Sequence, residues 1–340
     1  MLTELLIMVI KITIVVHVVL IGVAYTVYAE RRISAFIQNR YGPNRVGYEG
    51  LLQPFADVIK LAFKEDIVPE NANKSIHRLA PMISIFVALT TMAVIPFGYK
   101  IELFGITIPL QITDVNVGIL YILALTSLGV YGITLSGWAS NSKYSLFGGI
   151  RSSAQMISYE LSMGLSIIGV VLITGTLSLQ EIVIHQYGWK WNIILQPVGF
   201  IIFLVSAFAE TNRAPFDLPE AEPELVGGYH TEYSSMKFAL FFLAEYANMI
   251  IASAIITTLY LGGWQFPYLQ EFGLPPLVES LIQVLTFSLK VVFLVFFFIW
   301  VRWSIPRFRY DQLMNLGWKV MLPLSILNIT VTAIVITLLK

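Results

Sequence analysis

The feature that most constrains this chain is a series of apolar runs, each close to the length needed to cross a bilayer. A membrane-spanning helix needs about 20 predominantly apolar residues. Eight such runs occur, at residues 5–28, 78–97, 115–139, 154–175, 194–210, 236–262, 281–303 and 320–339. Because unpaired backbone groups cannot face lipid, we expect each run to be helical. The sequence therefore predicts an all-α integral membrane protein with about eight transmembrane helices, forming a single polytopic membrane domain over residues 1–340.

Composition narrows the possible functions. Only 12% of the 340 residues are charged, whereas soluble domains carry about 25%. The net charge is zero and no basic face is evident, so nucleic-acid binding is not expected. The chain has no cysteine, which excludes disulfides, cysteine-ligated iron–sulfur clusters and thiol catalysis. Of its four histidines, only His17 lies well inside an apolar run, too few for a haem between two spans. We therefore expect no bound cofactor, metal or catalytic residue on this chain.

The distribution of basic residues predicts the orientation. The first apolar run is too long for a cleaved signal and reads as a retained span. The odd-numbered loops contain nearly all the loop lysines and arginines, whereas the even-numbered loops contain only Lys100 and Lys190. The positive-inside rule therefore places the odd loops on the inner side and both termini outside. These inner loops cover residues 29–77, 140–153, 211–235 and 304–319.

The first inner loop contains an amphipathic segment. From Leu51 to Phe63 the apolar residues recur at helical spacing, and Asp57 lies away from the centre of their stripe. This pattern predicts a helix lying at the membrane surface. The simpler interpretation is a solvated helix in a loop whose charges only set the topology. An interfacial helix would also give an amphiphile a way in from the lipid.

Carboxylates are concentrated in and beside the apolar runs, where burying a charge in the membrane costs free energy. Residues 206–245 contain seven of them, and an eighth, Glu160, begins an earlier span. Glu160, Glu210 and Glu245 lie at similar depth on consecutive spans. One intramembrane acid is as often structural, paired with a neighbouring arginine, as functional. Three together favour a route for protons or ions, because a buried carboxyl group exchanges protons closer to neutrality.

The loop between Glu210 and Glu245 combines acids with backbone breakers. Its prolines, Pro215, Pro219 and Pro223, prevent a long helix, and two adjacent glycines permit a hinge. An ordinary acidic surface loop has the same composition. The acids on both sides favour a mobile segment that controls the access of water to them.

Several motifs together resemble one family. They are E-R-R, G-P-N-R-V-G, G-L-L-Q-P-F-A-D, A-E-T-N-R-A-P-F-D-L-P-E-A-E, E-L-V-G-G-Y-H-T-E-Y-S and P-R-F-R-Y-D-Q-L-M-N-L-G-W-K. Over essentially its whole length the chain resembles the H subunit of the bacterial proton-pumping NADH-quinone oxidoreductase (respiratory complex I) and its mitochondrial counterpart, NADH dehydrogenase subunit 1. Chance similarity would not place so many long motifs in the same order.

The resemblance implies a function, which the composition alone does not indicate. A member of this family anchors the peripheral arm and forms much of the tunnel for a long-tailed quinone, its substrate, while the iron–sulfur clusters and FMN are in partner subunits. The tunnel residues implied here are Arg31, Arg40, Asp57 and Arg307. The implied proton or coupling path comprises Glu160, Glu210, Asp217, Glu220, Glu222, Glu224 and Glu245. The implied partners are the quinone-site and iron–sulfur subunits, lipid, and small membrane subunits leading to antiporter-like subunits.

The sequence differs from the family motifs at two places, and two other functions are consistent with it. Tyr48-Glu49 replaces the proline–aromatic pair usual in the family, and Pro223 stands where a small polar residue is usual. A homologous membrane subunit of an energy-converting hydrogenase would share the acids but lack a quinone tunnel. A stand-alone ion-coupled transporter would normally show an internal repeat, which the sequence lacks. The lengths of the termini and the lack of a targeting segment favour the bacterial cytoplasmic membrane over the mitochondrial inner membrane.

Overall fold

A computed structural model describes residues 2–103, 105–218 and 226–339. Within these ranges seven helical segments are long and apolar enough to cross a membrane, which confirms the all-α membrane fold. They are α1 (Leu2–Ile37), α3 (Lys74–Thr91), α4 (Gly118–Ala139), α5 (Lys143–Thr174), α10 (Ser235–Tyr260), α11 (Pro276–Ser304) and a segment made of α12 (Tyr310–Asn315), a π-helical turn (Leu316–Met321) and α13 (Leu322–Leu339).

The remaining elements are short. They are α2 (Gln53–Phe63), α6 (Leu179–His185), α7 (Asn192–Leu195), α8 (Pro197–Glu210) and the 3₁₀ turns Tyr48–Gly50, Met92–Val94, Gly228–His230 and Leu269–Phe272. The strands β1 (Lys100–Leu103) and β2 (Ile106–Pro109) form an antiparallel hairpin with Ile101 opposite Ile108. The hairpin is absent from the sequence prediction because strands of four residues leave almost no periodic signal.

Two helices extend well beyond the apolar runs that predicted them. Helix α1 continues to Ile37, past the predicted end at residue 28, and α5 begins at Lys143 instead of residue 154. The extra turns carry charged residues such as Arg31 and Arg151. Hydropathy marks only the part of a helix that faces hydrocarbon, so it misses turns that continue into the inner loops.

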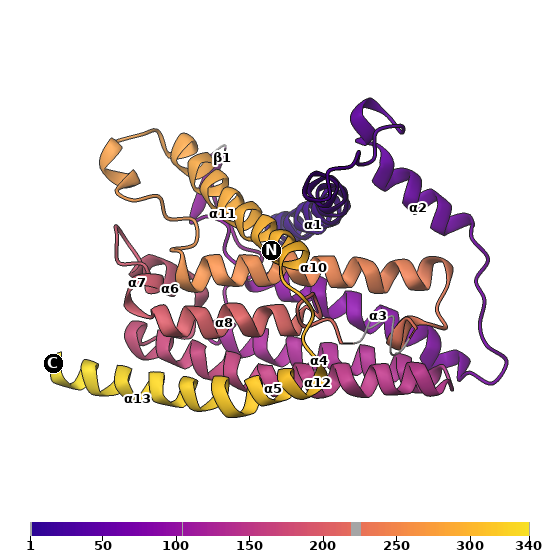
Figure 1. Cartoon of the computed structure of the whole chain (residues 1–340). Coiled ribbons are helices and arrows are strands. Elements are labelled where there is room, and N and C mark those ends of the chain that lie inside the picture. The colour runs from indigo at the N-terminus through magenta and orange to yellow at the C-terminus, as the bar shows by residue number, and fades with distance from the viewer. Residues whose placement is uncertain (1, 104, 219–225, 340) are drawn as a thin grey trace.

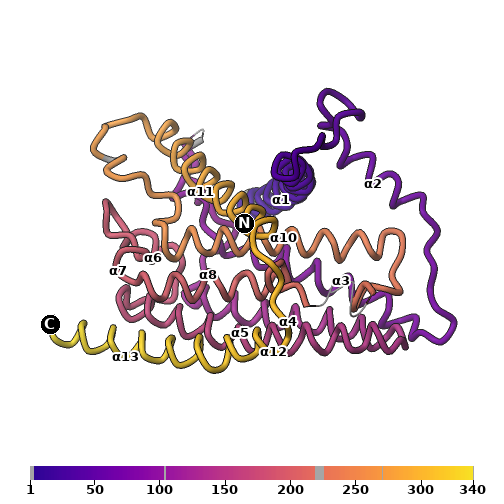
Figure 2. The backbone as a smooth tube through the Cα atoms, viewed as in Figure 1, coloured from indigo at the N-terminus to yellow at the C-terminus, as the bar shows by residue number. Residues whose placement is uncertain are grey.

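The helices pack as a layered bundle in which α3, α4, α5, α8 and α10 lie side by side, and α13 lies along α5 (Figure 1). Helix α1 is seen almost end-on while these helices are seen side-on, so it crosses the bundle steeply (Figures 1 and 2). The core contains the fully buried Tyr159, Phe203 and Tyr260. The starts of α3, α5 and α10 lie with α2 at one end, and α6, α7 and β1 lie toward the other.

Helix α8 is the element that shapes the interior. Its 14 residues rise about 21 Å, less than the ~30 Å of a hydrocarbon core. The non-helical residues that follow it are nevertheless buried, including Thr211, Arg213 and Asp217 at 3–4% exposure. Irregular backbone at membrane depth is tolerated only where protein encloses it. The short helix therefore brings a charged turn into the bundle instead of leaving it at the surface.

Candidate functional site

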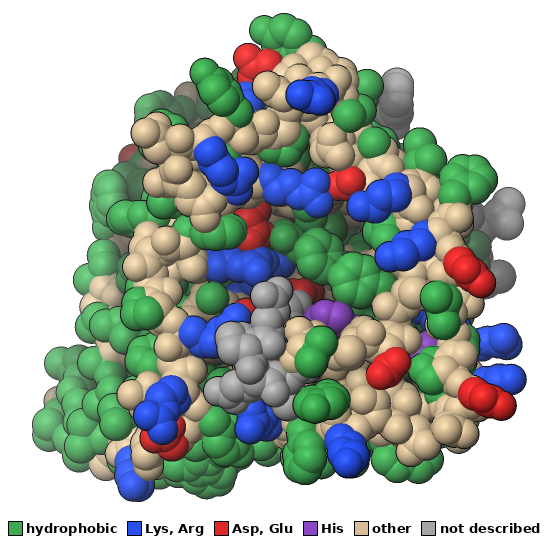
Figure 3. Space-filling model, turned by 45° about the vertical axis from the view of Figure 1, so that its right-hand side comes forward, with side chains coloured by type: hydrophobic (Ala, Val, Ile, Leu, Met, Phe, Trp, Pro, Cys, Tyr) green, Lys and Arg blue, Asp and Glu red, His purple; other side chains and the backbone are tan. Residues whose placement is uncertain are grey.

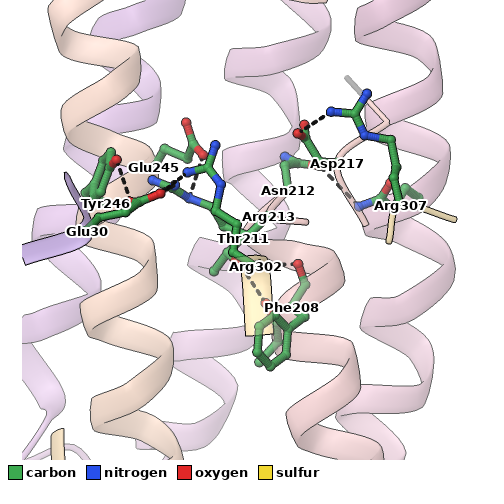
Figure 4. A network of polar contacts seen from close by, with 12 residues as sticks. Glu30, Phe208, Thr211, Asn212, Arg213, Asp217, Glu245, Tyr246, Arg302 and Arg307 are labelled. Carbon is green, nitrogen blue, oxygen red and sulfur yellow. Dashed lines mark hydrogen bonds and ion pairs between the residues drawn. The ribbon is translucent and has the colours of Figure 1, made fainter. Parts of the chain in front are cut away.

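Arg213, three residues beyond α8, is the centre of a buried ion cluster (Figure 4). Its Nη1 lies 3.2 Å from a carboxylate oxygen of Glu30 on α1, and its Nε lies 2.8 Å from Glu245 on α10. The guanidinium carbon stands 3.9 Å from the ring centroid of Tyr246. The preceding residue, Asn212, adopts a positive φ of 50°, a conformation that asparagine tolerates better than most residues. This turn directs the arginine toward two helices at once.

Glu30 receives two further donors. The hydroxyl of Tyr246 donates to it over 2.7 Å, and Arg302 of α11 pairs with its other oxygen. Two carboxylates and two guanidinium groups therefore balance within the protein, which is the condition under which buried charge is tolerated.

A cavity of about 70 Å³ adjoins the cluster between α3, α4, α5, α8 and α10. Glu210 and Glu245 both line it. Its other polar lining residues are Ser84, Thr91, Thr126, Thr211, Asn212 and Asn248. The rest of the wall is apolar, and a volume of this size has room for a few water molecules beside these polar groups. Glu245 therefore faces water-sized space on one side and Arg213 on the other.

Glu210 and Glu160 differ from Glu245 in their partners. In the described part of the chain no lysine, arginine or histidine pairs with Glu210. Glu160 on α5 accepts a hydrogen bond from the Ser127 hydroxyl and lies close enough to Glu210 for the two carboxylates to interact electrostatically. Glu160 does not itself line the cavity. Of the three acids singled out by sequence, Glu210 and Glu245 share the cavity, and Glu245 is ion-paired.

Asp217 and Arg307 form a second ion pair, 2.9 Å apart. The Phe216 and Phe308 rings stack beside it with centroids 5.4 Å apart, and the backbone N–H of Phe308 donates to the carbonyl of Pro215 over 3.0 Å. These contacts join the loop after α8 to the loop after α11. A residue predicted for the coupling path therefore meets one predicted for the quinone tunnel.

The first inner loop places the other predicted tunnel residues nearer the surface. Arg31 pairs with Asp57 over 2.7 Å, with Arg31 about half exposed and Asp57 more enclosed. Arg40 is exposed and donates to Gln38 over 2.7 Å. Basic side chains gather around a hollow in the face that carries these loops (Figure 3). Glu220, Glu222 and Glu224, also predicted for the coupling path, and Pro223 lie outside the described residues.

Comparison with known proteins identifies the family of this chain. The model of the NADH dehydrogenase family matches residues 10–333. The chain belongs to the NADH dehydrogenase family. An H subunit of NADH-quinone oxidoreductase from Cytophaga hutchinsonii is 54% identical over 96% of both chains. The H subunit of the Salinibacter ruber enzyme is 54% identical over 95% of this chain and 94% of that one. Subunit 8 of the Rhodothermus marinus enzyme is 54% identical over 95% of each. The resemblance predicted from the motifs is confirmed.

For this member of the NADH dehydrogenase family, the sequence prediction missed the residues of the buried ion cluster other than Glu245. Glu30, Arg213, Tyr246 and Arg302 were not predicted as site residues. A signal existed, because Glu30, Arg213 and Arg302 each lie at or just beyond the end of an apolar run. The identities of their partners depend on the steep crossing of α1 and the shortness of α8, which apolar runs do not reveal.

Proposed function

We propose that this chain is the membrane subunit of a proton-pumping NADH:quinone oxidoreductase in a bacterial cytoplasmic membrane. In this proposal it forms the access path for quinone and couples quinone reduction to proton translocation through buried carboxylates. Iron–sulfur clusters and FMN in partner subunits of the peripheral arm supply the electrons, and small membrane subunits receive the coupling signal. The names of the relatives support the proposal. The observation that carries it is the position of Arg213, between Glu30 of α1 and Glu245, which lines the interior cavity together with Glu210.

The mechanism is an electrostatic switch. Quinone would reach the inner face between α1 and α2, near the Arg31–Asp57 pair. Its reduction creates negative charge and a demand for protons beside these basic residues. Added negative charge near Glu30 would compete with its carboxylate for Arg213 and Arg302, which changes how Arg213 is shared between Glu30 and Glu245. Such re-pairing changes whether Glu245 and Glu210 hold protons from the cavity.

The direct test is Glu210→Gln in the intact complex. Gln keeps the shape of the side chain but cannot carry a proton, so we expect normal assembly with NADH:quinone reductase activity reduced roughly tenfold or more, as for loss of a proton-transfer group. Glu181→Gln, on the exposed face of α6, is the matched control. Blue native gels, quinone reduction and a pH-sensitive dye in vesicles provide the measurements. Wild-type turnover and pumping in Glu210→Gln would refute the coupling role.

Subunit identification separates this proposal from a hydrogenase role. Relatives about 54% identical over nearly the whole chain are named for NADH-quinone oxidoreductase, which favours the quinone enzyme. Purification from native membranes in mild detergent should yield an NADH-oxidising flavin arm with this chain. A nickel–iron partner in its place would overturn the assignment.

A further inference from the structure

A second cavity lies at the end of the bundle opposite α2. It measures about 310 Å³ and is bounded by the residues before β1, the end of α6, the loop after α10 and the first turns of α11. Figure 1 shows α6, β1 and the start of α11 together at this end of the bundle. We call this cavity the aromatic pocket, after its lining residues. They are Tyr99, Ile184, Tyr187, Trp264, Gln265, Phe266, Leu269, Glu279 and Gln283.

The pocket combines aromatic faces with one carboxylate. Tyr99, Tyr187, Trp264 and Phe266 supply rings, and Trp264 is only 2% exposed. Glu279 accepts a hydrogen bond from the Gln283 amide over 3.2 Å. No basic side chain pairs with Glu279 anywhere in residues 2–103, 105–218 and 226–339. An acid in the first turn of a helix also stabilises the helix dipole, but that role needs neither the rings nor the cavity.

A second polar group in the pocket lacks a partner within the described chain. Gln265 is 8% exposed and lines the pocket, yet its side-chain amide makes no hydrogen bond to any described residue. Its main-chain carbonyl is used elsewhere, accepting from Lys290 over 2.8 Å. Lys290 also donates to the carbonyls of Leu261 and Gly263, so it is held under the loop and does not neutralise Glu279. The Gln265 amide is therefore available to contact a ligand inside the pocket.

We propose that the aromatic pocket binds an organic ammonium group. Aromatic faces attract such cations through their quadrupoles, and quaternary or primary ammonium groups are recognised by aromatic cages. The Glu279 carboxylate supplies the opposite charge and the Gln265 amide oxygen accepts an N–H. Free amines and the headgroup of phosphatidylethanolamine share this chemistry. The site is separate from the quinone path and does not depend on the proposed function.

The test uses the complete complex purified from native membranes. Saturation-transfer difference NMR with ethanolamine and with choline detects weak binding of the free amines. Native mass spectrometry, after delipidation and reloading with equal phosphatidylethanolamine and phosphatidylglycerol, detects a retained lipid. Glu279→Gln and Tyr99→Leu remove the charge and one aromatic face. Glu271→Gln is the matched control, because Glu271 contacts the Tyr187 hydroxyl at 3.5 Å but does not line the pocket.

We expect wild-type protein and Glu271→Gln to bind alike, and Glu279→Gln to bind ethanolamine roughly tenfold more weakly, as for a lost charged hydrogen bond. Tyr99→Leu should weaken choline more than ethanolamine. Binding of free amines without lipid retention identifies a soluble ligand, and preferential retention of phosphatidylethanolamine identifies the lipid. Equal binding of every probe by wild type and Glu279→Gln, or binding by neither, would overturn the proposal.

Discussion

Arg213 is the residue on which the interior of the protein depends. One guanidinium serves two carboxylates through different nitrogens, from Nη1 to Glu30 and from Nε to Glu245. The planar fork of arginine allows this, whereas the point charge of lysine cannot hold both in the same geometry. The aromatic face of Tyr246 at 3.9 Å adds a cation–π contact. Helices α1 and α10 and the turn after α8 are therefore joined by a single side chain.

Replacing Arg213 by Met should leave Glu245 buried without its cation. Breaking one half of a buried ion pair costs about 3–5 kcal/mol. We expect much less assembled complex on blue native gels, with the remainder melting at lower temperature. Arg213→Lys should restore assembly in part, because it keeps the charge, but not full quinone reductase activity.

Arg309→Ala is the control for this pair of variants. Arg309 also has an acidic partner, Asp311 at 3.4 Å, but the two side chains are 79% and 64% exposed. Exposed pairs contribute little, so assembly should be unchanged. If Arg213→Met assembled as well as Arg309→Ala, the cluster would not hold the bundle together.

The sequence pointed to acids in the interior but not to their partners. Acids stand out because charge is rare in apolar runs, so Glu160, Glu210 and Glu245 were found without a structure. Arginines at span ends are common as interfacial anchors, so Arg213 and Arg302 did not stand out. Which acid pairs with which arginine depends on which helices lie next to one another. Apolar runs in the sequence give the length of a helix but do not identify its neighbours.

At the scale of elements, polar contacts hold α2 to the bundle at its middle and near its end. Asp57, in the middle of α2, pairs with Arg31 of α1. Beyond its end, Asp66 pairs with Lys237 of α10 over 2.8 Å, and the Ser235 hydroxyl donates to the carbonyl of Leu61 over 3.0 Å. The apolar side chains of α2 stay exposed, including Phe55, Ile59 and Phe63. The amphipathic surface helix predicted from sequence therefore exists, anchored by polar contacts and not by its apolar face.

Glu49 makes two further contacts from the same loop to α1. Its carboxylate pairs with Arg32, and its backbone carbonyl accepts from the Tyr28 hydroxyl over 2.7 Å. It also adopts a positive φ of 49°. Glu49 thus connects the turn before α2 to α1 through an ion pair and a backbone hydrogen bond.

Replacing Asp57 by Asn tests whether α2 guides quinone. The change removes the charge that pairs with Arg31 but keeps the side-chain shape. We expect the apparent KM for quinone to rise severalfold in the intact complex, with the effect depending on tail length, because α2 would guide the tail as well as the headgroup. Asp66→Asn, whose carboxylate also ties this loop to the bundle, is the matched control. If the kinetics of quinone reduction were unchanged for quinones of several tail lengths, Asp57 would be a surface charge without a role in guiding quinone.

At the scale of the whole molecule, the orientation depends on α8. With eight crossings both termini lie outside, whereas seven would place them on opposite sides. Seven segments of the described chain qualify by length, and α8 has only 14 apolar-rich residues. Its start follows α7, at the end that carries α6 and the hairpin. Its last residue, Glu210, lines the cavity inside the bundle. The chain completes the crossing only if the buried turn around Arg213 continues to the inner side.

Because the chain has no cysteine, single introduced cysteines can decide this point. Three membrane crossings, α3, α4 and α5, separate Lys64 from Lys190, so these two positions lie on opposite sides of the membrane. Between Lys190 and Arg309 lie α8, α10 and α11, so the side of Arg309 depends on whether α8 crosses. A membrane-impermeant maleimide should label Lys64→Cys and Arg309→Cys in inverted vesicles stripped of peripheral subunits, and Lys190→Cys in right-side-out vesicles. If α8 and its turn did not cross, Arg309→Cys would instead react on the same side as Lys190→Cys. In that case Glu210 and Arg213 would face the outer side, and an inner-side quinone event could not reach them through this cluster.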